Sequence, residues 1–114
     1  MSGRGRVVLA VVPDLMDRSR LSAAPGVEVV AVTAGGVAAE LVSRAETGVD
    51  LVVADVSRPG VLDAVSDLSV PVVGFAPHVD DGLFTRAAQA GIEALARSVF
   101  FRRWPDVGPA VVRT

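Results

Sequence analysis

One carboxylate at the end of an apolar run is the residue best placed to do chemistry in this sequence. Leu51 to Ala54 are apolar, Asp55 follows them directly, and Pro59 comes four residues later. A short apolar run bounded by turn residues is typical of a strand buried on both faces, as at the centre of a parallel sheet. Open parallel sheets place their binding sites at the carboxyl ends of strands. We therefore expect a functional role for Asp55, the alternative being a carboxylate that only caps the next helix.

Other polar residues are predicted at the same edge of the sheet. Asp14 follows a first apolar run, where it fits the N-cap of a helix more simply than a metal ligand. His78, the only histidine, is either a switch or an ordinary loop residue. Asp80 and Asp81 stand where a helix is expected to begin, a position at which the helix dipole favours carboxylates. We interpret these two as capping residues.

Strand-like and helix-like segments alternate along the chain with short connections, which indicates repeated βα units. Right-handed crossovers then give a three-layer, doubly wound α/β domain. Because Glu28 lies in the second strand and the first, third and fourth are the most apolar, we expect a flavodoxin-like parallel five-stranded sheet of order 2-1-3-4-5. Pro105 and Pro109 predict a short last helix. The expected strands are 6–12, 27–33, a run ending at 55, 70–76 and 92–96, and the expected helices are 15–23, 37–46, 61–68 and 81–90.

The composition limits the class of protein. The chain has 114 residues, no cysteine and a formal net charge of −2, so it is not expected to bind nucleic acid generally. No apolar run approaches the ~20 residues that a membrane span needs. All 11 basic residues are arginine, which removes lysine chemistry. We expect one cytoplasmic domain over residues 1–114, with a disordered arm at 1–5 and a truncated helix and tail at 99–114.

With these elements placed, the chain resembles the response-regulator receiver domain of two-component signalling, the chemotaxis-regulator-like fold. The stretch DLVVADVSRPG is similar to the receiver segment in which a strand ends in the phospho-accepting aspartate, with proline four residues on; Asp55 and Pro59 match these positions. The stretch VPVVGFAPHVDDGLFTRAAQAGIEALARSVF is similar to the fourth strand, fourth helix and fifth strand. The resemblance covers roughly residues 6 to 101.

Most other positions that carry receiver chemistry differ here. Receivers hold Mg²⁺ with an acidic pair after the first strand, where this chain has Val12 and Pro13. The hydroxyl residue that ends the fourth strand of a receiver is replaced by Ala76, and the lysine that ends the fifth is replaced by Ser98, with Arg97 beside it. The resemblance therefore implies a degenerate receiver, or pseudo-receiver.

A thin donor set for Mg²⁺ remains, consisting of Asp14, Asp55 and the carbonyl of Ser57. Phosphoryl transfer to a carboxylate needs a divalent cation to neutralise charge on the phosphoryl oxygens. In this chain the phosphoryl group would have to be sensed by His78 and Arg97. Arg97 could pair with Asp55 as the receiver lysine does. No cofactor is certain on these grounds, and Mg²⁺ is the one implied.

The sequence favours a stand-alone atypical receiver-like signalling module that acts through protein–protein interaction, with weak or absent phosphorylation. It would not be an enzyme beyond phosphoacceptor and autophosphatase-type chemistry. Two alternatives stay open: an active response regulator phosphorylated on Asp55 with Mg²⁺, and a small ligand-binding or enzymatic flavodoxin-like protein. The expected partner is a protein or a second copy of the chain, with no nucleic acid or membrane. Phe100, Phe101 and Trp104 most simply cover the sheet, but an exposed aromatic surface there would mark an interface or homodimer contact.

Overall fold

Five strands and five helices alternate without exception in the computed structural model, which describes residues 5–78 and 80–107. This confirms the alternation predicted from the sequence. The elements are β1 Arg6–Val11, α1 Leu15–Ser22, β2 Val27–Ala31, α2 Val37–Ser43, β3 Leu51–Asp55, α3 Val61–Val65, β4 Val72–Ala76, α4 Asp81–Gln89, β5 Glu93–Ala96 and α5 Arg97–Arg103.

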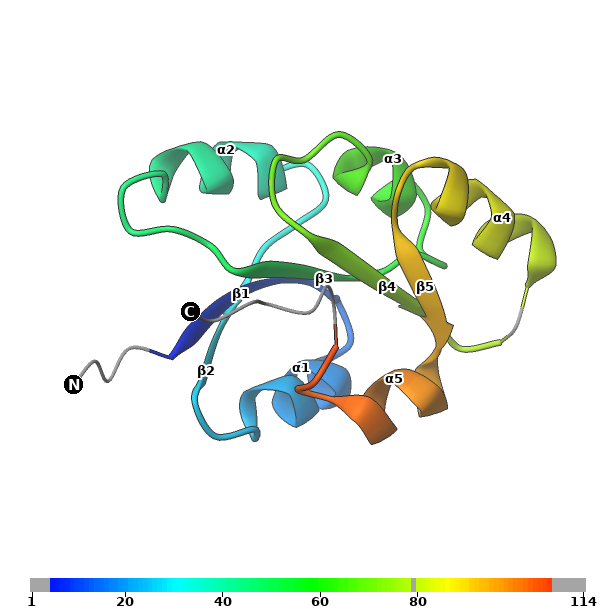
Figure 1. Ribbon diagram of the computed structural model, residues 1–114, viewed down its shortest axis with the longest axis horizontal. Helices are drawn as coiled ribbons and strands as arrows, with labels where there is room; N and C mark the ends of the chain where they lie inside the picture. Colours follow the sequence, from blue (N-terminus) through cyan, green and yellow to red (C-terminus); the bar gives the residue numbers. More distant parts are fainter. Residues whose placement is uncertain (1–4, 79, 108–114) are drawn as a thin grey trace, which may run out of the picture.

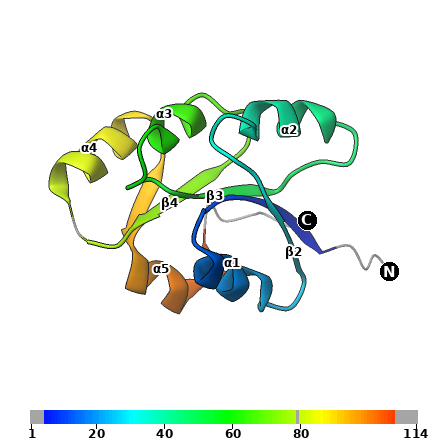
Figure 2. The same cartoon turned by 180° about the vertical axis from the view of Figure 1, so that it is seen from behind.

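The five strands form one parallel sheet of order β2-β1-β3-β4-β5, as expected. β3 lies at the centre and all of its residues are buried, whereas β2 is an edge strand with Glu28 exposed. Helices α2, α3 and α4 cover one face of the sheet, and α1 and α5 cover the other (Figures 1 and 2). The flavodoxin-like, three-layer architecture is therefore confirmed.

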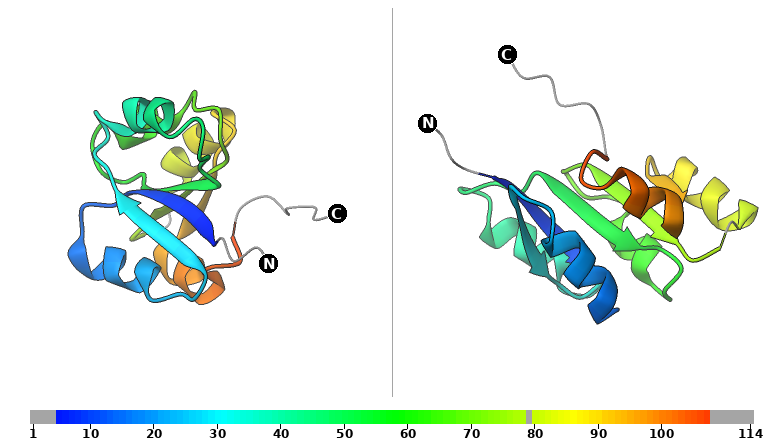
Figure 3. Two further views of the ribbon diagram at one scale, coloured as in Figure 1. Left: turned by 90° about the vertical axis from the view of Figure 1, so that its left-hand side faces the viewer. Right: turned by 90° about the horizontal axis from the view of Figure 1, so that it is seen from below.

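Two apolar layers separate the sheet from its helices, because successive side chains of a strand point to opposite faces. Leu9 and Val52 contribute to the layer under α2, α3 and α4, while their neighbours Val8 and Val53 pack with Phe75 in the layer under α1 and α5. The left-hand view of Figure 3 shows the sheet between these two helical layers. Each large apolar side chain buried in this way contributes about 1.5–3 kcal/mol to folding.

The helices end earlier than their apolar periodicity predicts. α3 stops at Val65, and the hydroxyl of Ser66 donates to the carbonyl of Leu62 over 2.6 Å, so a side chain takes part in closing the helix. α2 stops at Ser43, ahead of a turn that ends in Gly48 with a φ of 87°. None of the described helices is long and apolar enough to cross a membrane.

The C-terminal segment corrects one detail of the sequence interpretation. β5 ends at Ala96 and α5 begins at the next residue, Arg97, so Ser98 is the second residue of a helix and not the end of a strand. α5 has seven residues, which confirms the short last helix. The tail from residue 108 onward, and the arm expected at 1–5 apart from Gly5, lie outside the described residues.

Candidate functional site

Asp55 ends the central strand, and its carboxylate is held by the residues that follow it. The side chain is 4% exposed. One oxygen, Oδ1, accepts hydrogen bonds from the backbone N–H of Ser57 at 3.1 Å and from its hydroxyl at 2.5 Å. The other, Oδ2, accepts from Nε of Arg58 at 3.3 Å. A carboxylate that bonds the N–H two residues on is a common turn former, so local geometry accounts for much of this arrangement.

The loop after Asp55 leads into α3 through a tight turn. The carbonyl of Asp55 accepts from the N–H of Arg58 at 3.2 Å. Gly60 then adopts a φ of 79°, in the left-handed region that glycine enters at little cost. Pro59 and Gly60, which mark a turn in the sequence, therefore place Arg58 back against the strand end.

A second ion pair lies beside the first and joins distant parts of the chain. Arg97 donates from Nε to both carboxylate oxygens of Asp17, at 3.0 and 3.1 Å, and from Nη2 to Oδ1. The Asp17 side chain is 5% exposed and that of Arg97 is 38% exposed. The hydrogen bond to Asp17 raises the pKa of Arg97, burial opposes this, and the charges of Asp17, Asp14 and Asp55 raise the pKa further. Arg97 is thus influenced by the charge of Asp55, but its hydrogen bonds go to Asp17.

Asp17 was missed by the sequence interpretation, although a signal was present. Asp17 and Leu21 are four residues apart in α1 and are its two buried residues. A carboxylate that shares the buried face of a helix needs a partner, because an unpaired buried charge is strongly unfavourable. Arg58 was also missed as the partner of Asp55, although the three-residue spacing is short enough to suggest it.

The other predicted site residues have separate environments. Asp14 is the N-cap of α1 and accepts from the N–H of Asp17 at 3.0 Å. Asp80 caps α4 in the same way through the N–H of Leu83. Ala76 ends β4 and is buried, whereas His78 is exposed in the loop that follows. The capping interpretations of Asp14 and Asp80 are confirmed, whereas Asp81 is the first residue of α4 and not its cap.

The C-terminal aromatic residues cover the sheet, as the simpler interpretation holds. Phe100 is fully buried, and its ring centroid lies 5.0 Å from that of Phe75. Trp104 stacks on Phe100 with centroids 5.5 Å apart and donates from Nε1 to the carbonyl of Leu21 at 3.0 Å. Assignment of Phe100 to an exposed interface is therefore wrong, because no part of its side chain reaches the surface. The assignment stays a prediction only for the half-buried Phe101 and Trp104.

The residues around Asp55 do not fit the Mg²⁺ ion that the fold implies. Arg58 places a positive charge against Asp55, and Asp14 uses Oδ1 to cap α1. Val12 stands where a receiver has an acidic residue and is buried. Within residues 5–78 and 80–107, no three histidine, cysteine, aspartate or glutamate side chains gather as a metal site would require. We therefore derive no step through a metal ion.

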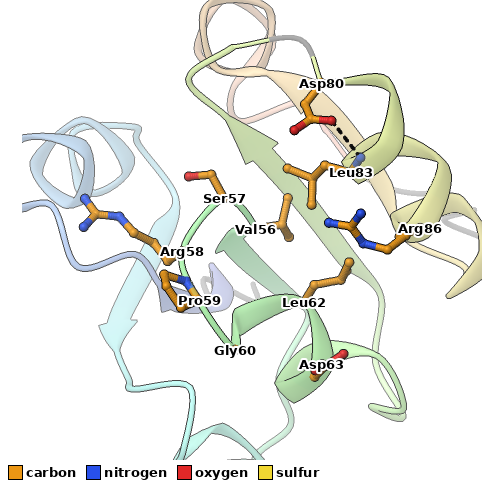
Figure 4. Close-up of a pocket in the computed structure, with 10 residues that line it drawn as sticks. All are labelled: Val56, Ser57, Arg58, Pro59, Gly60, Leu62, Asp63, Asp80, Leu83 and Arg86. Carbon is orange, nitrogen blue, oxygen red and sulfur yellow. Dashed lines mark hydrogen bonds between the residues drawn. The ribbon is translucent and has the colours of Figure 1, made fainter.

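A cavity of about 310 Å³ adjoins the loop after β3 and is shown in Figure 4. Arg86 reaches over it from α4, and Asp63 lies on α3. Asp80 also lines the cavity while bonding the N–H of Leu83. The cavity carries charges of both signs, and Asp55 does not line it.

Comparison with solved structures decides the fold family. A response regulator from Thermotoga maritima matches with a TM-score of 0.69 at 17% sequence identity, over 87% of this chain and 93% of that one. A LuxR family DNA-binding response regulator from Silicibacter pomeroyi matches with a TM-score of 0.60 at 24% identity, over 85% of this chain and 86% of that one.

This chain has the receiver fold. The sequence itself matches no family model and no curated protein. The structural likeness therefore extends to the arrangement of the backbone, in which Asp55 ends the central strand. The residues around that strand end are this chain's own.

Proposed function

We propose that this receiver-fold chain is an atypical signalling module that acts by contacting a protein partner, without depending on phosphorylation of Asp55. One observation carries the proposal: the Asp55 carboxylate is buried and already compensated by Ser57 and Arg58. A phosphoacceptor must present a carboxylate oxygen to the incoming phosphorus. Here both oxygens accept hydrogen bonds from the chain itself.

Electrostatics support the same conclusion. In phosphoryl transfer a divalent cation neutralises the charge that builds on the phosphoryl oxygens. In this chain the cation next to Asp55 is the guanidinium of Arg58, with Nε 3.3 Å from Oδ2. A guanidinium has no open coordination position, so it cannot bind acceptor and phosphoryl oxygens as Mg²⁺ does.

The groups that would read a phosphoryl group are also engaged or absent. Ala76 has no hydroxyl to donate, and it is buried at the end of β4. Arg97, the cation nearest in position to the receiver lysine, is bound to Asp17. A phosphoryl group on Asp55 would have to break that pair before Arg97 could reach it.

The partner we propose is a protein. The net charge of −2 gives no electrostatic attraction to nucleic acid phosphates. The Silicibacter pomeroyi structure is described as a DNA-binding response regulator, and that description applies to that protein. A second copy of this chain is an alternative protein partner. The receiver fold also supports a cytoplasmic setting.

A second candidate function is favoured by one specific feature. Asp55 stands at the carboxyl end of the central strand, with Pro59 four residues on, as in a phosphorylated receiver. If Arg58 swings away, the carboxylate becomes available to Mg²⁺ and a phosphodonor. The chain would then be an active response regulator.

Titration with Mg²⁺ and then beryllofluoride, a phosphoryl mimic, separates the two functions. The readout is the set of backbone amide NMR shifts of the whole chain. Because Arg58 compensates Asp55, we expect neither ligand to shift the amides of Asp55, Ser57 and Ala76 at millimolar concentration.

Asp55→Asn is the test variant, and Asp63→Asn, which removes an exposed carboxylate from α3, is the matched control. Shifts around Asp55 that appear in the native chain and in the control, but not in Asp55→Asn, would replace the proposal with the active response regulator. Nonspecific binding of Mg²⁺ to surface carboxylates would instead be equal in all three chains.

A further inference from the structure

A second cavity, of about 400 Å³, opens where β1 and β2 end, beside the loop after β3. Its walls are mostly apolar and include Val12, Val32 and Pro59, and two arginines, Arg18 and Arg58, complete it. No residue that lines it is acidic. We propose that this cavity binds a small organic anion, a carboxylate or phosphate group carried on an apolar body.

Arg18 provides the first argument for an anion. Its Nε is buried and has no hydrogen-bond partner in the part of the chain that the structure describes. A buried donor without an acceptor is costly, and a cationic one more so, so such a group indicates a water or ligand that completes it.

The carboxylates nearest in sequence to Arg18 are already used. Asp17 binds Arg97, and Asp14 caps the helix with Oδ1. The ion pairs among residues 5–78 and 80–107 involve other arginines, so the charge of Arg18 is not balanced by a neighbouring side chain. An acceptor for it has to come from outside these residues.

Arg58 provides the second cation from a different element. Its Nε is bonded to Asp55, while no bond to its terminal nitrogens is found among the described residues. In Figure 4 the Arg58 side chain extends away from Arg86, toward the blue N-terminal part of the chain. Two guanidinium groups that meet one cavity suit a carboxylate or phosphate, because their planar forks donate in pairs.

Size and lining set the class of ligand. Pockets that bind small molecules are typically about 300–1,000 Å³ and are lined by apolar groups with a few polar contacts. Val12, Val32 and Pro59 would contact the body of such a ligand, and the arginines its charged group. The carboxyl ends of strands are also where open α/β sheets bind ligands.

This inference goes beyond the proposed protein contact and does not depend on it. The cavity and the strand end at Asp55 nevertheless share one residue. Arg58 contacts Asp55 and also lines the cavity. A bound anion would form an ion pair with the Arg58 guanidinium, which now neutralises Asp55. Ligand binding would therefore change the same strand end that phosphorylation changes in a receiver.

Phenyl phosphate is the probe, because it joins a phosphate to an apolar ring small enough for the cavity. Amide NMR shifts during its titration are expected at Val12, Val32, Thr33 and Ala34 and around Arg58, which surround the cavity. Inorganic phosphate and phenol, which each carry one half of the probe, should bind at least about tenfold more weakly. Benzoate replaces phosphate by carboxylate and distinguishes the two kinds of anion.

Arg18→Gln removes the charge and keeps a hydrogen-bonding side chain, and it should weaken phenyl phosphate binding about tenfold. Arg86→Gln is the matched control, because Arg86 lies in α4 and lines the other cavity. Ala31→Leu fills the proposed cavity without altering charge and should also abolish the shifts. A dispersed amide spectrum and an unchanged circular dichroism spectrum verify folding of each variant.

Retained affinity in Arg18→Gln or Ala31→Leu would overturn the proposal, as would equal losses in Arg86→Gln. Shifts confined to residues around Arg86 would place the anion in the other cavity and have the same consequence. Absence of binding by both phenyl phosphate and benzoate would also exclude the proposed site. None of these outcomes bears on the Mg²⁺ and beryllofluoride titration, which tests Asp55.

Discussion

At the scale of the residue, the site is a set of carboxylates that the chain satisfies by itself. Asp55 accepts from Ser57 and Arg58, and Asp17 accepts from Arg97. Asp14 caps a helix. Both oxygens of Asp55 and of Asp17 thus accept hydrogen bonds from the chain, which supports a structural interpretation of this strand end over a metal site.

Breaking the Arg97–Asp17 pair should destabilise the protein. Arg97→Gln leaves the buried carboxylate of Asp17 with a weaker donor, and we expect the free energy of unfolding to fall by about 1–3 kcal/mol. The value stays below that of a fully buried pair because Arg97 is 38% exposed. Urea denaturation followed by the fluorescence of Trp104, the only tryptophan, measures it.

The control for this variant is Arg103→Gln, which removes an exposed pair with Glu93 at 3.7 Å. A surface pair contributes about 0–1 kcal/mol, so the control should lose little stability. Equal losses in the two variants would show that the Arg97–Asp17 pair is no stronger than a surface contact.

The raised pKa of Arg97 confines any pH dependence of this loss to strongly alkaline solution. A cation whose folded-state pKa lies above its unfolded value contributes full stability below the unfolded pKa and loses it as the pH rises through the folded pKa. The ordinary pKa of arginine is already strongly alkaline and that of Arg97 is raised further, so Arg97 stays charged throughout the range in which most proteins are studied. We expect the penalty of Arg97→Gln to be equal at pH 7 and pH 9 in urea denaturation. A penalty that shrinks by pH 9 would mean that another group titrates at the pair.

At the scale of the element, close packing between β4 and the segment after β3 limits what β4 can contain. Gly74 lies in the middle of β4, and a Cβ atom added to it would lie 2.7 Å from Cγ1 of Val56. Val56 is buried and its branched side chain has little freedom to move. Glycine is required at this position because of a close approach and not because of a positive φ.

Gly74→Ala should therefore destabilise the protein by about 1–3 kcal/mol through overpacking. Thermal unfolding by circular dichroism measures the change. The matched control is Gly35→Ala, where an added Cβ would meet nothing within 4 Å. Val56→Ala in the Gly74→Ala background should recover part of the loss, and a double variant no more stable than Gly74→Ala would contradict the overpacking explanation.

At the scale of the whole molecule, α5 and the residues just after it connect β4, α1 and β1. Phe100 packs on Phe75 of β4, and Trp104 bonds the carbonyl of Leu21 in α1. Arg6 of β1 donates from Nη1 to the carbonyl of Pro105 at 2.7 Å. The short α5 is thus packed into the core, although it ends at Arg103, two residues before Pro105.

Phe100→Ala should cost about 3–5 kcal/mol, because it removes a fully buried aromatic ring from a packed layer. Native domains have a free energy of unfolding of only about 5–15 kcal/mol, so this single change would remove a large part of the stability. Phe101→Ala is the control, since Phe101 is half-buried and should lose less. Urea denaturation ranks the two, and a larger loss for Phe101→Ala would mean that the layer under α5 is organised differently.

Much of the fold could be predicted because its signals are local. Apolar runs such as Leu51–Ala54, and the turn residues Pro59 and Gly60, indicate where strands end whatever lies around them. The edge position of β2 could also be predicted from the sequence. Glu28 interrupts an otherwise apolar run, and a charged side chain is favourable only in a strand that is partly exposed. Helix ends were less predictable, because side-chain contacts such as that of Ser66 with Leu62 help to decide them.

The sequence by itself determined the order of elements, the sheet, the caps at Asp14 and Asp80, and the place of Asp55 at the end of the central strand. Only the tertiary structure decided which charges meet. Arg97 and Asp17 are 80 residues apart. Each could have paired with a different residue without any change in the sequence pattern of its own strand or helix. Ion pairs and cavities depend on how separate loops converge at one edge of the sheet, whereas strands and turns depend on neighbours along the chain.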